Sequence, residues 1–194
     1  MTSFPRQFGF AILLGAALFA AGCGGALYSV KSPVVSPLPD SAASGSDPGV
    51  EIDAAAMFDD DESHDVFGVN MLMSGILPVR IEMVNSGWTA IDVGQAKFAL
   101  QDGDGKQWKA RSAKQAAERV LKYYDVYLYN PSSRKLYLEA MKLHDFDHES
   151  PLGPGERRTG FVFFQSPGKE QIDRPVGLVM LVQKLPQTVE VKLN

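Results

Sequence analysis

The single cysteine, Cys23, is the side chain best placed for covalent chemistry, because a thiolate is a strong nucleophile. It follows an apolar run, Phe8–Ala20, and the small residues Ala21 and Gly22, and Arg6 precedes the run. A basic start, an apolar run and small residues in this order are typical of a cleaved export signal. The run is shorter than the about 20 residues needed to cross a bilayer, so we expect cleavage and not a membrane span.

The segment Ala20-Ala21-Gly22-Cys23 resembles the bacterial lipobox, although that motif more often has Leu where Ala20 stands. The resemblance implies lipid attachment at Cys23, cleavage before it, and anchoring by the acylated new N-terminus, for example with palmitate. Acylation by more than one chain gives durable membrane anchoring. We therefore expect a lipid-anchored protein of the bacterial cell envelope, on the outer membrane facing the periplasm. The alternative is an ordinary secretory signal in which the cysteine is incidental.

Two clusters of possible metal ligands also occur. The acidic run at 59–65 (DDDESHD) has carboxylates that suit Ca²⁺, but it lacks the spacing of an EF-hand loop. His144 and His148 would share a helix face, but HExxH is absent and no further cysteine is available. Asp102 and Asp104 alternate with glycines, as in a hairpin turn. We expect a solvated loop at 59–65, and we predict neither a metal nor a cofactor.

Tyrosines gather in the middle of the chain and are the candidate binding residues. They are Tyr123, Tyr124, Tyr127, Tyr129 and Tyr137. Tyrosine combines an apolar ring with a polar hydroxyl and is frequent in interface hot spots, so we predict contacts with a partner or ligand through Tyr124, Tyr127, Tyr129 and Tyr137. The alternative is packing between a helix and a sheet with hydroxyls that reach solvent.

No catalytic motif is present in the sequence. A G-x-S-x-G nucleophile elbow, a P-loop and a G-x-G-x-x-G loop are all absent, and we predict that the protein is not an enzyme. The formal net charge is −4 over 194 residues, without a basic stripe. A mildly acidic chain of this kind lacks the electrostatic footprint of a nucleic-acid-binding protein, and we exclude that class.

Composition divides the chain into three parts: a signal peptide at 1–22, a linker rich in Gly, Ser and Pro at 23–48, and a folded domain at 49–194. Within the domain, alternating or continuous apolar residues predict several β-strands. The strand candidates are 50–54, 66–73, 79–83, 89–93, 97–100, 160–164, 177–182 and 189–193. Residues 160–164 are apolar on both faces, so we expect a facing sheet to cover one side and helices, or a partner, to cover part of the other.

Two helices are predicted between these strands. Ser112 and Gln115 have the spacing of a capping box, and apolar residues follow them at helical spacing. Ser133 is expected to cap the second helix, whose apolar stripe would be Leu136, Ala140 and Leu143, with Tyr137 and Met141 beside it.

Several motifs together resemble bacterial lipoproteins with an uncharacterised immunoglobulin-like domain. These motifs are Leu77-Pro78-Val79 leading to Asn85, Leu100-Gln101-Asp102 with Gly105, and 152–156 (LGPGE) before 160–164. The resemblance implies a mainly β, antiparallel immunoglobulin-like sandwich with one or two inserted helices. We expect a non-catalytic module that docks an envelope protein or a cell-wall component. The alternative is a small-ligand or glycan-binding protein, or an enzyme, that uses the tyrosine-rich helical segment.

Overall fold

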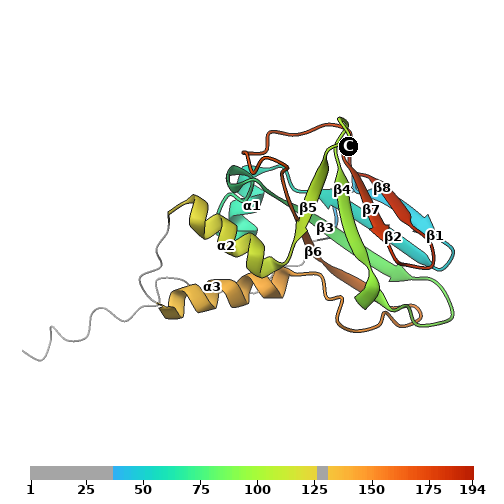
Figure 1. Ribbon diagram of the computed structural model, residues 1–194. Helices are drawn as coiled ribbons and strands as arrows, with labels where there is room; N and C mark the ends of the chain where they lie inside the picture. Colours follow the sequence, from blue (N-terminus) through green and yellow to red (C-terminus); the bar gives the residue numbers. More distant parts are fainter. Residues whose placement is uncertain (1–36, 126–130) are drawn as a thin grey trace, which may run out of the picture.

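The computed structural model describes residues 37–125 and 131–194, and in this part of the chain eight antiparallel strands and three α-helices form the fold (Figure 1). The strands are β1 (Ala43–Asp47), β2 (Val50–Ala56), β3 (Ile76–Asn85), β4 (Lys97–Gln101), β5 (Gln107–Arg111), β6 (Arg157–Gln165), β7 (Val179–Gln183) and β8 (Val189–Lys192). The helices are α1 (Asp60–Phe67), α2 (Ala113–Tyr123) and α3 (Pro131–His144). Short 3₁₀ turns occur at Leu72–Ser74 and Val93–Gln95. The prediction of a mainly β domain with helices is therefore confirmed.

The strands follow the order β1-β2-β3-β6-β5-β4-β7-β8, and the sheet is nearly barrel-shaped. Strand β5 joins the two halves, because Trp108 pairs with β4 while 109–111 pair with β6. The two outermost strands, β1 and β8, also come close together. A Cβ placed on Gly45 of β1 would lie 2.4 Å from the carbonyl oxygen of Glu190 in β8, so only glycine allows this approach.

The main core lies inside this curved sheet. Alternate residues of each strand point inward, and the inward set of β3 (Leu77, Val79, Ile81 and Met83) is fully buried. Val50, Ile52 and Ala54 of β2 are likewise 0% exposed, as their alternation with acidic residues predicted. Strands β4, β5, β6, β7 and β8 contribute the remaining strand residues of this core.

A second core lies on the outer face of β3 and β6, beneath the helices. Phe161 and Phe163 of β6 point to this side, whereas Val162 and Phe164 point into the main core. The ring of Phe67, at the end of α1, packs edge to face on Phe161 and Phe163, with centroids 5.1 and 5.7 Å away. The expectation that 160–164 is covered on both faces is confirmed.

Helix α2 begins as the capping box predicted. The Ser112 hydroxyl accepts a hydrogen bond from the Gln115 N–H, and the Gln115 side chain accepts one from the Ser112 N–H. Ala113, Ala116, Ala117 and Val120 face the second core. Arg119 fixes the same helix to neighbouring turns by donating to the carbonyls of Ser74 and Lys169, each at 3.0 Å.

Helix α3 buries a stripe that is rotated from the predicted one, although Ala140 belongs to both. Its buried residues are Ser133, Tyr137, Ala140, Met141 and His144, whereas Leu143 is 60% exposed. Ser133 lies inside the helix and does not cap it, because α3 already includes Pro131. Neighbouring residues of a helix are about 100° apart, so the stripe of Tyr137 is rotated by that angle from the predicted stripe of Leu136. The aromatic surface of β6 packs against the stripe of smaller and aromatic side chains.

The chain passes directly from the second core to the main core after α3. His144 packs on Phe67 with ring centroids 5.2 Å apart, and two residues later Phe146 packs on Phe98 in the main core. Between them, the Phe146 N–H donates to the Phe161 carbonyl oxygen at 3.0 Å. The crossing runs over Gly160, where a Cβ would lie 2.5 Å from the Phe146 Cα.

Three other sequence predictions are corrected by the structure. Strand β1 lies inside the range 23–48 assigned to the linker, so ordered structure begins before Val50. The acidic run at 59–65 forms most of α1 and is not a loop, because Asp59 caps the helix and acidic residues in its first turn interact favourably with the helix dipole. Neither 66–73 nor 89–93 is a strand; Ile91 forms only an isolated bridge with Leu152.

Candidate functional site

The tyrosines that the structure describes differ in their surroundings. Tyr137 is 3% exposed in the second core, so the prediction that it contacts a partner is wrong, and the alternative of helix–sheet packing holds for it. Tyr123 and Tyr124 end α2, with rings 41% and 38% exposed and packed edge to face at 5.0 Å. Tyr127 and Tyr129 lie outside the described residues.

The Tyr124 hydroxyl has a structural partner, because it donates to the Asn70 carbonyl oxygen at 2.9 Å. Burial raises the pKa of Tyr124, and the nearby Tyr123 and Asp60 raise it further. The hydroxyl is therefore protonated at neutral pH, and its proton is used within the protein. Tyr124 remains a possible apolar contact at the C-terminal end of α2.

One hollow runs along α3 and is bordered by the start of α2. It has a volume of about 550 Å³. It is lined from α3 and the residue after it by Pro131, Arg134, Lys135, Leu138, Glu139, Lys142 and Asp145, and from the start of α2 by Ser112, Ala113 and Lys114. We call this feature the α2–α3 groove. Its α3 residues recur every three or four positions, which places them on one face of the helix.

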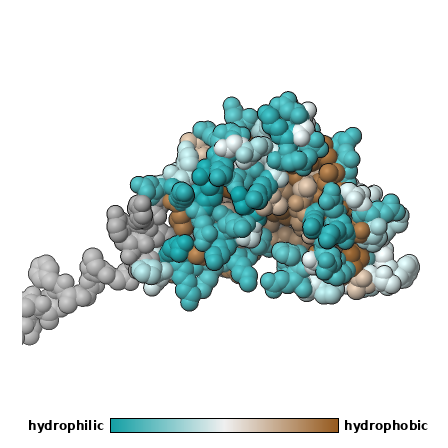
Figure 2. All heavy atoms as spheres, viewed as in Figure 1, coloured by the Kyte–Doolittle hydropathy of each residue, from teal (hydrophilic) through white to brown (hydrophobic). Residues whose placement is uncertain are grey.

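The floor of the α2–α3 groove is apolar and its edges are charged. Leu138, together with the aliphatic stems of the lysines, supplies apolar surface. Two of its cations are already paired: Lys135 with Glu139 at 3.7 Å, and Arg134 with Glu118 of α2 at 3.5 Å. Hydrophilic residues cover much of α2 and α3 in the view of Figure 2, with smaller apolar areas between them.

Asp145 closes one end of the groove. Its carboxylate accepts a hydrogen bond of 3.4 Å from the Ala113 N–H, which is one of the free N–H groups at the start of α2. Burial raises the pKa of Asp145 above its usual value, although this hydrogen bond and the charges of His148 and Lys142 act in the opposite direction. Asp145 therefore joins the start of α2 to the end of α3 and fixes the width of the groove at that end.

A second, polar hollow of about 470 Å³ lies beside α1. Asp59, Asp60, Asp61 and Asp173 line it together with Arg174. Residues 37–125 and 131–194 contain no group of three or more His, Cys, Asp or Glu side chains placed to hold a metal ion.

His144 is 7% exposed in the second core, and burial lowers its pKa. His148 contacts the Phe146 carbonyl at 3.1 Å through Nδ1.

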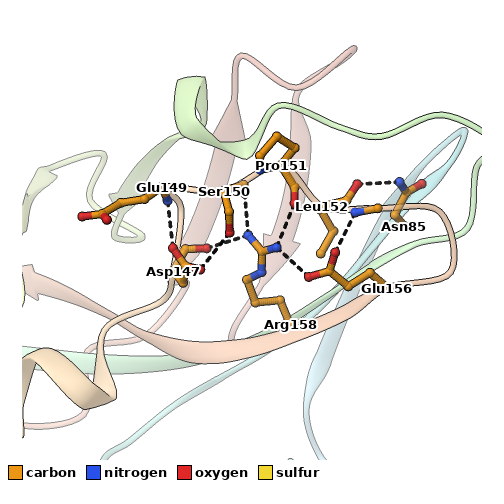
Figure 3. A network of polar contacts seen from close by, with 9 residues as sticks. Asn85, Asp147, Glu149, Ser150, Pro151, Leu152, Glu156 and Arg158 are labelled. Atoms are coloured by element: carbon orange, nitrogen blue, oxygen red, sulfur yellow. Dashed lines mark hydrogen bonds and ion pairs between the residues drawn. The ribbon is translucent and has the colours of Figure 1, made fainter.

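The polar network shown in Figure 3 is structural. Asn85, at the end of β3, is fully buried, and its side-chain amide donates to the carbonyls of Leu152 and Thr89 at 2.9 and 2.8 Å. Arg158 of β6 donates to the carbonyls of Asp147, Ser150 and Pro151, so its guanidinium holds the 147–151 loop.

The Glu156 carboxylate lies between these two groups. It accepts from the Gly153 N–H at 2.7 Å and from Arg158 at 2.6 Å. We call these residues the Asn85–Arg158 junction. It brings together the Asn85 motif and the 152–156 motif, which lie far apart in the sequence. All of these contacts are between residues of the protein itself, so the junction has a structural role.

Sequence reasoning missed the α2–α3 groove and the exposed Trp88. The groove could have been found as the polar face of α3, but its depth depends on how α2 and α3 pack. Trp88 is 96% exposed in the loop after β3, and no pattern around it predicted this. In residues 37–125 and 131–194, no helix combines the length and apolar character required to span a bilayer.

No protein-family model matches this chain, and comparisons with curated proteins and with solved structures gave no significant match. The functional argument therefore depends on the residues and geometry given above. Cys23, the predicted acylation site, lies outside the described residues, so it remains a prediction from the sequence.

Proposed function

We propose that this chain is a lipid-anchored lipoprotein of the bacterial cell envelope, on the outer membrane facing the periplasm, whose folded domain docks a partner protein without catalysis. The observation that carries the docking role is the α2–α3 groove, an apolar hollow with charged edges on the helical layer. Hollows of this kind between helices are frequent binding sites. The anchoring role rests on the sequence around Cys23.

The proposal includes an immunoglobulin-like sandwich as the finer description of the fold. Support comes from the all-antiparallel pairing and from a core that lies between β2, β3 and β6 on one side and β4, β7 and β8 on the other. The helices then form an extra layer on the outer face of one sheet. We propose that the partner docks on the surface of this helical layer.

The described chain starts on this same outer face. Arg80, which points outward from β3, donates to the Pro37 carbonyl oxygen at 3.2 Å. The stretch from Cys23 to Pro37 can reach at most about 50 Å, at about 3.6 Å for each residue. A lipid at Cys23 would therefore keep the domain close enough to the membrane to meet other envelope proteins.

Anchoring is tested by labelling growing cells with an alkyne analogue of palmitate. The expected result is that the wild-type chain is labelled and the Cys23→Ala variant is not, because only the thiol accepts the lipid. Equal labelling of both chains would contradict the anchor.

Docking is tested separately by placing a photoreactive amino acid at Leu138, in the groove, and at Glu190, an exposed residue of β8, in two matched variants. We expect discrete protein adducts from position 138 and none from position 190. Absence of adducts from both positions would refute docking at the groove.

Small-ligand binding is the second candidate, and the size of the groove favours it, since such sites commonly enclose 300–1,000 Å³. Native mass spectrometry of the chain purified from its own membranes decides between them. A bound small molecule that the Leu138→Asp variant loses, together with no protein adduct at position 138, would favour this candidate over docking.

A further inference from the structure

The α2–α3 groove is long enough to hold an elongated ligand. Its lining follows α3 from Pro131 to Lys142 and on to Asp145, a path of about 20 Å at 1.5 Å for each helical residue. A groove of this length and depth fits a peptide segment of several residues, which can place successive side chains along it. A flat bilayer surface would contact only its edges.

The charge of the groove is opposite to that of the whole chain. The chain carries −4, yet the groove cations outnumber its anions. The cations are Lys114, Arg134, Lys135 and Lys142, and the anions are Glu139 and Asp145. A local excess of positive charge on an acidic protein favours an acidic partner and disfavours a basic one.

The positions of the cations define where the negative groups of the partner would lie. Lys114 and Lys142 form no ion pair within 4.0 Å with any described residue, and both are exposed. They lie at the end of the groove nearest Asp145, whereas the paired cations Arg134 and Lys135 lie toward Pro131. Between the two ends, Leu138 offers an apolar contact.

We propose that the α2–α3 groove binds an acidic peptide segment of a partner protein, with an apolar side chain on Leu138 and carboxylates facing Lys114 and Lys142. This inference rests on the proposed docking function and names the chemistry of the partner. Part of the affinity comes from burial of the apolar side chain, and the charges set specificity and association rate.

The test pans a phage-displayed library of random 12-residue peptides against the full chain purified in detergent. Selected peptides are expected to carry a net negative charge and at least one large apolar residue. The double variant Lys114→Glu, Lys142→Glu should weaken their binding at least tenfold, and added salt should weaken binding to the wild type. The matched control, Lys97→Glu with Lys192→Glu, reverses two exposed lysines of β4 and β8 and should bind as the wild type does.

The inference is overturned if no peptide is selected, if the selected peptides are not acidic, or if the groove variant binds them unchanged while its circular dichroism matches the wild type. Sedimentation of the unlipidated Cys23→Ala chain with phosphatidylglycerol vesicles tests the membrane as the occupant. Vesicle binding that Lys114→Glu, Lys142→Glu abolishes, without peptide binding, would assign the groove to lipid and refute the inference.

The outcomes also separate this inference from the docking function. Protein adducts at position 138 without any acidic peptide selected would leave docking in place and refute the acidic segment. Loss of both the adducts and the peptides would refute the two together.

Discussion

Replacement of Asn85 by alanine tests the Asn85–Arg158 junction most directly. The side chain is fully buried and makes three hydrogen bonds: its amide donates to Thr89 and Leu152, and its Oδ1 accepts from the Gly87 N–H at 2.9 Å. The Leu152 carbonyl would keep a second bond, from the Ile91 N–H.

The expected loss follows from these contacts. A buried hydrogen bond contributes about 1 kcal/mol net, and a buried group left without a partner costs more. With one of the three partners still bonded elsewhere, the free energy of unfolding should fall by about 2.5 kcal/mol. For a domain of this size, the melting temperature should then fall by roughly 5–10 °C.

Urea unfolding followed by circular dichroism measures this change. Ser86→Ala is the matched control in the same turn, because Ser86 is exposed, and it should stay within about 0.5 kcal/mol of the wild type. Asn85→Asp should be at least as unstable as Asn85→Ala, since it keeps the acceptor for Gly87 but loses both donors and buries a charge. An Asn85→Ala variant as stable as Ser86→Ala would refute the structural role of the junction.

Two further predictions concern the passage between the cores. Gly160→Ala should lower the free energy of unfolding by about 2 kcal/mol or more, because the new Cβ meets the Phe146 backbone, whereas Gly153→Ala, whose Cβ would have only a 3.4 Å contact with the Glu156 carboxylate, should change it by less than about 1 kcal/mol. Comparable urea midpoints for these two variants would contradict the close approach of the Phe146 backbone to Gly160. Burial lowers the pKa of His144 in the folded state, so the unfolded chain binds its proton first and stability should decline as the pH falls through about 6.5. His144→Leu should make the melting temperature less dependent on pH between 7.5 and 5.5, and an unchanged pH dependence would argue against the buried neutral imidazole.

The strands were predictable because burial on one side leaves a period of two in the sequence. Val50, Ile52 and Ala54 gave that signal, and 160–164 gave the signal of a strand covered on both faces. The start of α2 was equally local, since Ser112 and Gln115 complete their capping box within one turn.

The sequence predictions were wrong where the same stretch of residues fits two local structures. The acidic run at 59–65 has the Asp59 cap, the Glu62 N–H that bonds to it, and Gly68 in a left-handed conformation at the end of α1, yet its charge alone suggested a loop. In α3 both the Leu136 stripe and the Tyr137 stripe have helical spacing. Only the shape of β6 beneath the helix decides between them, and that shape is set by residues distant in sequence.

The candidate site was less predictable than the fold for the same reason. Tyrosine clustering indicated a surface, but Tyr137 is buried and the groove is formed by charged residues and Leu138. Its position depends on the packing of α2 against α3 and on the Asp145 carboxylate at the start of α2. No short stretch of sequence contains that information.

The close crossing of the chain over Gly160 makes the helical layer and the β-sheet core thermodynamically dependent on each other. Because His144 packs on Phe67 and Phe146, two residues later, packs in the other core, displacement of His144 would also disturb the packing of Phe146. The two layers should therefore melt in one cooperative transition. A ligand held beside α3 at 100 times its dissociation constant would add about 2.7 kcal/mol to the stability of strands that it never contacts. Hydrogen exchange in β4 and β7 would then report the occupancy of the groove.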